Sequence, residues 1–209
     1  MKNKILLFIL LIISLIISSC NNSTDPGEIS EFIFKTPIVT GLIITNDDPT
    51  AIKVWRNPQF PADKIYCEEN NHFFYYKNPS SSRIPCLMNL YYPFPNPSSE
   101  SVNLEFSLPI KTKVTIWVVK ARLPEAGEKD FEETSGGNFI ASANKVIAKL
   151  IDDELNAGYY KAKWDCSEVP SGFYRVYFKA DSHLFWKDIL LARSINDMPN
   201  DLRQLLKNK

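Results

Sequence analysis

Side chains able to carry catalysis are scarce in this 209-residue chain. A nucleophile–histidine pair has only His72 and His183 to supply the base. His72 stands beside two phenylalanines and His183 falls at an expected hairpin turn, so structural or exposed roles are favoured for both. The sequence contains no Gly-x-Ser-x-Gly, His-Glu-x-x-His, phosphate-loop or dinucleotide motif. We therefore expect a protein that is not an enzyme and that needs no cofactor.

Two acidic clusters offer oxygen ligands of the kind that calcium prefers. They are Asp47-Asp48 and Asp152-Asp153-Glu154. Calcium loops space their ligands along the chain, whereas these carboxylates are merely adjacent. We interpret both clusters as solvated turns and expect no metal site.

The clearest chemical signal is the segment that ends at Cys20. Lys2 and Lys4 give it a positive start, residues 5–17 form an apolar run with one serine, and two serines precede the cysteine. The run is shorter than the roughly 20 residues that span a bilayer, so it predicts a secretory signal. The ending Ile-Ser-Ser-Cys resembles a bacterial lipobox, which implies cleavage before Cys20 and its lipidation. The alternative is an ordinary signal peptide that happens to meet a cysteine.

Lipidation of Cys20 leaves three cysteines, Cys67, Cys86 and Cys166, an odd number that cannot pair completely within the chain. Outside the cytoplasm, a Cys67–Cys86 disulfide would close a modest loop and stabilise the fold. The alternative is two buried free thiols. The sequence has no Cys-x-x-Cys, and with two histidines a Cys/His zinc site is not expected.

Length and charge set the domain organisation and the partners. We assign residues 1–19 to a lipoprotein signal peptide and residues 20–30 to a lipidated tether, which leaves room for one large or two small domains. Loss of two lysines with the signal leaves 22 basic against 24 acidic residues, a formal charge of −2. Nucleic acid is therefore disfavoured as a partner. We expect attachment to the lipid bilayer through acylated Cys20, and an envelope protein or glycan as a further partner.

Residues 31–85 predict a small β-rich region. Turn formers separate short apolar or aromatic runs, which lie at 32–39, 42–45, 51–55, 65–67 and 72–77. The Asn-Pro-Ser-Ser-Ser stretch at 78–82 predicts the boundary of this region.

Residues 90–193 carry a cleaner strand pattern. Leu104, Phe106 and Leu108 alternate with polar residues, which indicates a half-buried strand with one wet face. Further strands are expected at 111–122, 145–151, 159–164, 173–180 and 184–191, with a long polar excursion at 123–144. The close spacing predicts an all-β fold, an antiparallel β-sandwich. Residues 194–209 predict a short C-terminal helix capped by Asp197 or Asn200, or else a frayed tail.

A series of motifs in residues 90–193 carries a family resemblance. In order, the motifs are Tyr91–Pro97, Val102–Pro109, Val114–Trp117, Leu155–Tyr159, Trp164-Asp165 and Pro170–Val176. The series resembles the Ig-like C-terminal domain of the flagellar hook-capping protein and of many secreted proteins of Bacteroidetes-type bacteria. In the latter, this domain often acts as a sorting signal for type IX secretion.

The same motifs have physical roles in a sandwich. Trp164 is expected to fill the core between the sheets, with Asp165 beginning the next turn. Gly158 and Gly172 each precede a strand, where glycine can adopt positive φ. The proline-rich stretch Tyr91–Pro97 predicts an extended lead-in that cannot pair as a central strand.

Three functions remain open at this point. The first is a non-enzymatic envelope lipoprotein whose Ig-like sandwich binds or scaffolds. The second is a type IX secretion client or accessory with residues 90–193 as its recognition domain. The third is an enzyme or carbohydrate-binding protein that stacks sugars on aromatic residues of the N-terminal region, namely Trp55, Phe60, Tyr66 and Phe73–Tyr76. Asn21 stands where some bacteria place an aspartate for inner-membrane retention, which favours the outer membrane, facing either periplasm or medium.

Overall fold

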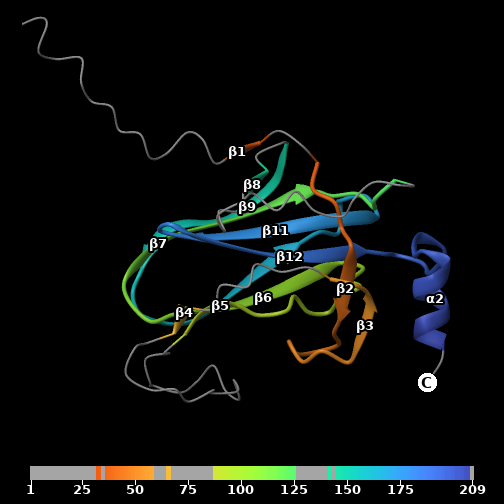
Figure 1. The fold of residues 1–209 in the computed structure, drawn as a ribbon, viewed down its shortest axis with the longest axis horizontal. Helices are drawn as coiled ribbons and strands as arrows, with labels where there is room; N and C mark the ends of the chain where they lie inside the picture. The colour runs from red at the N-terminus through yellow and green to blue at the C-terminus, as the bar shows by residue number, and fades with distance from the viewer. Residues whose placement is uncertain are drawn as a thin grey trace, which may run out of the picture. The chain divides into compact units, whose positions relative to one another are not determined.

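A computed structural model describes residues 32–33, 36–58, 65–66, 87–125, 141–142 and 145–207. This part of the chain consists mainly of β-strands, with one α-helix near the C-terminus (Figure 1). The described residues belong to one compact unit, Phe32–Lys209. The predicted signal peptide, the tether and the expected run at 72–77 lie outside the described residues.

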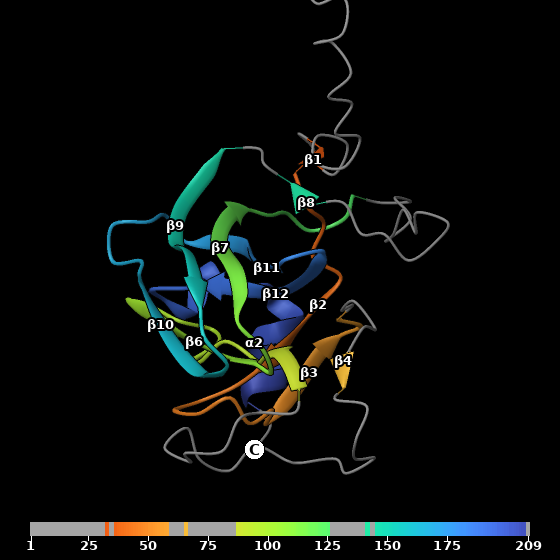
Figure 2. The ribbon, with the colours of Figure 1, turned by 90° about the vertical axis from the view of Figure 1, so that its left-hand side faces the viewer.

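Two four-stranded sheets form the main body of this unit (Figures 1 and 2). The first has the order β10-β6-β5-β4 and consists of β4 (Ile65–Tyr66), β5 (Leu87–Leu90), β6 (Ser101–Leu108) and β10 (Gly158–Asp165). The second has the order β12-β11-β7-β9 and consists of β7 (Thr112–Lys120), β9 (Val146–Leu155), β11 (Gly172–Ala180) and β12 (His183–Leu191). Neighbouring strands within both sheets run antiparallel. The predicted all-β sandwich is confirmed.

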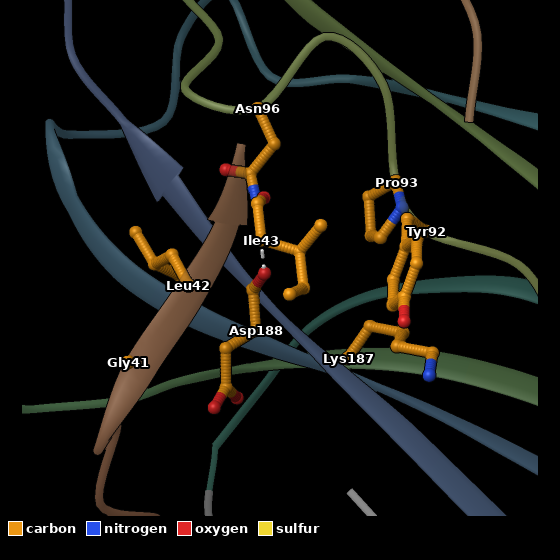
Figure 3. A pocket seen from close by; sticks show the side chains of 8 residues that line it. All are labelled: Gly41, Leu42, Ile43, Tyr92, Pro93, Asn96, Lys187 and Asp188. Atoms are coloured by element: carbon orange, nitrogen blue, oxygen red, sulfur yellow. Dashed lines mark hydrogen bonds between the residues drawn. The ribbon is translucent and has the colours of Figure 1, made fainter. Parts of the chain in front are cut away.

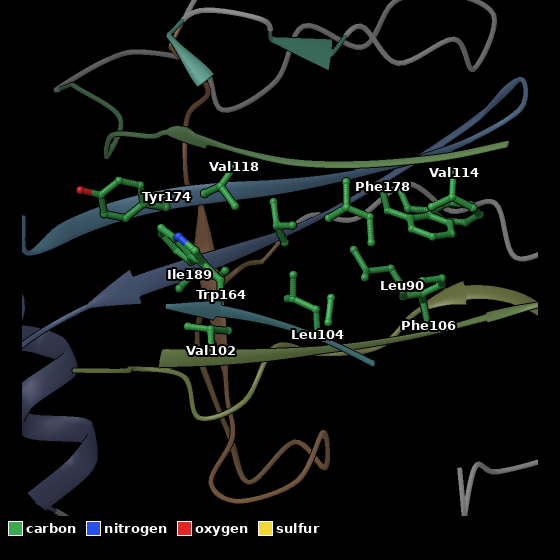
Figure 4. Packing of buried hydrophobic residues seen from close by; sticks show 14 of the residues in the cluster. Leu90, Val102, Leu104, Phe106, Val114, Val118, Trp164, Tyr174, Phe178 and Ile189 are labelled. Atoms are coloured by element: carbon green, nitrogen blue, oxygen red, sulfur yellow. The ribbon is translucent and has the colours of Figure 1, made fainter. Parts of the chain in front are cut away.

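The inner faces of the two sheets enclose the main hydrophobic core (Figure 4). Alternate residues of β6 point into it and are fully buried, namely Val102, Leu104, Phe106 and Leu108. Strands of the other sheet contribute Val114, Ile116, Val118, Val176 and Phe178. Trp164 is only 2% exposed and lies in this core, as the sequence predicts, and its ring meets Tyr174 edge-on at a ring distance of 5.5 Å. Burial of these apolar side chains between the sheets is the main driving force for the fold.

The outer face of β6 is drier than its sequence predicts. Glu105 and Ser107 were expected on a wet face, yet they are 5% and 0% exposed. The segment after β5 runs alongside β6, where the Tyr91 amide donates to the carbonyl of Glu105 at 2.9 Å. Ser107 donates to the carbonyl of Leu87 at 2.6 Å, and Lys161 lies 3.3 Å from the Glu105 carboxylate. Long-range contacts that alternation cannot reveal thus bury this face.

Two further strand pairs accompany the sandwich. β1 (Phe32–Ile33) pairs in parallel with β8 (Ala141–Ser142), and β2 (Gly41–Ile44) forms an antiparallel hairpin with β3 (Lys53–Arg56). The chain ends in a 3-10 helix, η1 (Ile195–Asp197), and in α2 (Asn200–Lys207). The predicted C-terminal helix is thus present. Asp197 belongs to a capping box with Ser194 that begins η1 and not α2.

A second hydrophobic cluster joins segments from both ends of the unit. Its buried members lie in or directly beside the β2–β3 hairpin, β7, β12 and α2: Val39, Leu42, Ile44, Trp55, Ala121, Leu190, Ala192 and Leu202. The predicted N-terminal region and C-terminal tail therefore share one core with β12.

Three local expectations differ from the structure. β5 was not predicted as a strand, because its short sequence lacks a clear alternation. β9 continues to Leu155, so the acidic residues 152–154 lie in an edge strand and not in a turn. Gly172 adopts a φ of +149°, as expected, but Gly158 does not take a positive φ.

Candidate functional site

The cysteines do not form a site in the described part of the chain. Cys20, Cys67 and Cys86 lie outside the described residues. Cys166 is a free thiol that is fully buried in the main core. Burial raises the pKa of Cys166, although the nearby charge of Arg193 opposes this shift. A thiol that is buried and protonated has low reactivity, so Cys166 serves packing.

The acidic cluster at 152–154 forms ion pairs with neighbouring lysines. Asp152 lies 2.7 Å from the amine of Lys149 and 3.0 Å from that of Lys113, and Glu154 lies 2.6 Å from Lys111. Within the described ranges, no group of three or more His, Cys, Asp or Glu side chains is placed to hold a metal ion. Asp152 instead pairs with Lys113 of β7 and with Lys149 of β9 itself, and Glu154 pairs with Lys111, which directly precedes β7.

Two further candidates from the sequence, Asp48 and His183, also lie in local structures that account for them without a ligand. Asp48 accepts a hydrogen bond from the Thr50 amide at 2.7 Å, which closes a local turn. Thr50 thereby lowers the pKa of Asp48. His183 is half-buried at the start of β12, directly after the turn at 181–182, as expected. His72 lies outside the described residues.

Trp55 is not available for stacking on a sugar. Its side chain is 2% exposed, its ring stacks on Phe173 at 5.9 Å, and the guanidinium of Arg56 lies 4.3 Å from the ring centre. Trp55, one of the aromatic residues named for the carbohydrate-binding alternative, therefore presents no open aromatic face. Phe60 and Phe73–Tyr76 lie outside the described residues, and only the backbone of Tyr66 is described.

The most elaborate polar arrangement centres on Asn96, which is 1% exposed. Its amide nitrogen donates to the carbonyls of Ile43 and Asp188, both at 3.0 Å, and its amide oxygen accepts from the Leu190 amide at 3.0 Å. Figure 3 shows this side chain pointing toward β2 and β12. Asn96 and Thr45 also pair through their backbones. One side chain thus joins the proline-rich segment to β2 and β12.

Beside Asn96 lies the most deeply buried ion pair of the described chain. Arg175 on β11 stands opposite Asp188 on β12, and the guanidinium binds the carboxylate through two hydrogen bonds of 2.6 and 2.8 Å. The same guanidinium donates to the carbonyl of Ile38 at 2.9 Å. Burial opposes the charge of Arg175, but the carboxylate of Asp188 outweighs it and raises the pKa of Arg175, so the guanidinium stays charged.

The space around these groups is too small for an ordinary ligand. A hollow with a volume of about 10 Å³ lies next to Asn96 and is lined by Gly41, Leu42, Ile43, Tyr92, Pro93, Asn96, Lys187 and Asp188 (Figure 3). Sites for drug-sized ligands enclose roughly 300–1,000 Å³. The polar groups of Asn96, Arg175 and Asp188 are already satisfied by one another and by the backbone. This arrangement can hold three segments together, but it offers no group poised for catalysis.

Sequence patterns do not predict the polar centre that Asn96, Arg175 and Asp188 form. Asn96 and Arg175 both fall inside motifs that carry the family resemblance, but those motifs do not reveal their partners. Asp188 follows Lys187 in a strand pattern, where a charged residue ordinarily faces solvent. Only the register of β11 against β12 shows that Asp188 faces Arg175.

Fold and site together define the described part of the chain as an all-β sandwich with a buried polar centre. In the described residues, no helix is long and apolar enough to cross a membrane. No family model, no curated protein and no solved structure matches the chain.

Proposed function

We propose that the protein is a non-enzymatic lipoprotein of the bacterial envelope, anchored through Cys20 and using its β-sandwich for binding or scaffolding. One observation carries this proposal: the apolar run of residues 5–17 ends at an isoleucine that begins the lipobox-like sequence Ile-Ser-Ser-Cys, which would make Cys20 the mature N-terminus. Lipoproteins of this kind carry several acyl chains, and more than one chain is needed for firm attachment. The outer membrane is the proposed location because Asn21 follows Cys20.

The chemistry of the described residues supports a role without catalysis. The thiol of Cys166 is buried, and the buried ion pair of Arg175 and Asp188 is satisfied internally. Asp152 and Glu154 of β9 are paired with lysines. These thiol, guanidinium and carboxylate groups thus take part in packing and pairing within the sandwich. Such an arrangement fits a domain that binds or scaffolds through its surface.

A membrane fractionation experiment tests the anchor. Wild-type protein is expected in the membrane fraction and to stay there after washes with high salt. Cys20→Ala is expected to leave that fraction, because no acyl chain can then be attached, whereas the matched control Ser23→Ala stays. Retention of Cys20→Ala in the membrane fraction would contradict the proposal.

Type IX secretion is the second candidate function, favoured by the ordered motifs of residues 90–193. Two features place it second: the lipobox-like start, and the continuation of the chain beyond β12 into η1 and α2. The full chain should be followed in a type IX-competent host and in a secretion-deficient derivative. Equal membrane association in both strains supports the anchored lipoprotein, whereas a location that depends on the secretion system supports the alternative.

A further inference from the structure

The C-terminal helix covers an apolar surface that is separate from the core of the sandwich. Leu202 of α2 is fully buried, and Leu205 and Leu206 are partly buried against the same cluster. Beneath them lie Leu42, Ile44 and Trp55 of the β2–β3 hairpin, together with Leu190 of β12. This second cluster has no buried residue in common with the main core between the sheets.

Side chains, and not backbone pairing, attach α2 to the hairpin. Lys53 of β3 donates to the carbonyl of Leu205 at 2.7 Å, and Arg56 forms an ion pair with Asp201 at 2.9 Å. The side chains of Arg56 and Asp201 are 38% and 49% exposed, so their attraction is weakened by water. In the described residues, no hydrogen bond joins the backbone of α2 to the backbone of a strand. Helix α2 can therefore detach without breaking a sheet ladder.

The strands beneath α2 are attached differently. β2 is held to the sandwich by Asn96, which donates to the carbonyl of Ile43, and by Thr45, which donates to the carbonyl of Pro93 at 2.7 Å. Within the described residues, β3 pairs only with β2, and its Lys53 donates to the Leu205 carbonyl of α2. Departure of α2 would thus leave β2 in place while it uncovers Trp55 and Leu42.

We propose that α2 is a clasp that opens as a local unit while the sandwich remains folded, and that its opening uncovers the apolar surface of the β2–β3 hairpin and β12. Local opening of this kind is expected where a segment is held by few buried side chains and no ladder. Leu202 makes the main contribution to holding α2 in place, because it is the fully buried side chain of α2.

Native-state hydrogen exchange on the full chain tests the clasp. In the wild type, amides of α2 are expected to exchange through an opening with a smaller denaturant dependence than that of the amides of β6, β7 and β11, because less surface is exposed. Leu202→Ala should speed exchange in α2 by about 30-fold or more, the ratio that corresponds to a buried leucine truncation. The sandwich strands should still exchange through a slower, denaturant-dependent opening.

Ile195→Ala is the matched control, because Ile195 is an apolar residue of the same segment but is 47% exposed. This variant should leave the exchange of α2 nearly unchanged. The proposal is overturned if α2 and β11 exchange in the wild type with the same rate and the same denaturant dependence. It is also overturned if Leu202→Ala accelerates all of these elements equally, since α2 would then open only with global unfolding.

Discussion

Arg175 and Asp188 stand directly opposite each other on β11 and β12 and form a two-point ion pair, with Nε–Oδ1 and Nη2–Oδ2 distances of 2.6 and 2.8 Å. Their side chains are 11% and 5% exposed. Through the carbonyl of Ile38, the same guanidinium also holds the segment that leads into β2. The pair therefore stabilises the junction between the hairpin and the second sheet.

Removing one partner of this pair should be costly. Asp188→Ala leaves a buried guanidinium without its carboxylate, and we expect the free energy of unfolding to fall by about 3–5 kcal/mol. Urea unfolding at neutral pH measures this loss. Glu154→Ala is the control, because its ion pair with Lys111 is 59% exposed on both sides and should change stability by less than about 1 kcal/mol. Equal losses in the two variants would contradict the structural role of the buried pair.

The hairpin depends on a glycine at its first position. A Cβ atom on Gly41 would lie 2.5 Å from the carbonyl oxygen of Trp55 and 2.6 Å from the nitrogen of Pro58, and backbone atoms cannot easily move away. Gly41→Ala should lower the free energy of unfolding by about 1–3 kcal/mol. Gly158→Ala is the comparison in urea titrations, because its nearest contact is the Tyr160 ring at 3.4 Å. A larger loss for Gly158→Ala than for Gly41→Ala would be inconsistent with this packing.

Asp152 in the edge strand β9 should make the free energy of unfolding depend on pH in the acid range. Hydrogen bonds and charges from Lys149 and Lys113 lower the pKa of Asp152 to about 2. Because the unfolded chain titrates near pH 4, this carboxylate stabilises the fold above about pH 4, and the contribution disappears as the pH falls toward 2. Urea midpoints between pH 6 and pH 2 should therefore fall less steeply for Asp152→Asn than for the wild type. If the urea midpoints of the two proteins fell in parallel with pH, the stabilising role of the ion pairs of Asp152 would be refuted.

Sequence patterns predict the sandwich well because its signals are local. The alternation in β6 and the tryptophan at the end of β10 both follow from the two-residue period of a strand that packs on one side. The dry outer face of Glu105 could not be predicted, because a segment pairing alongside β6 covers it. The acidic residues at 152–154 were interpreted as a turn because Lys111 and Lys113, which pair with Glu154 and Asp152, come from a distant part of the sequence.

The polar centre was missed for the same physical reason. Asn96 reaches residues 53 and 92 positions away in the chain, Ile43 and Asp188. No local periodicity encodes such distances. The burial of Trp55 likewise depends on Phe173 and on the C-terminal helix, so its aromatic ring looked free when the N-terminal region was considered by itself.

Cys166 should be unreactive in the folded protein. Its side chain is fully buried, and burial raises the pKa of its thiol, which keeps the reactive thiolate scarce. Alkylation at pH 8, followed by peptide mass mapping, should leave Cys166 unmodified in the native protein and modify it fully in urea. Rapid labelling of Cys166 without denaturant would contradict its place in the core.

The central claim is that Cys20 anchors the protein to the membrane, and mass spectrometry of the mature N-terminus tests it most directly. Protein purified from the membrane fraction should begin at Cys20 and carry a diacylglyceryl group on that residue, and Cys20→Ala should lack the modification. A mature chain that begins at any other residue, or an unmodified Cys20, would contradict the claim.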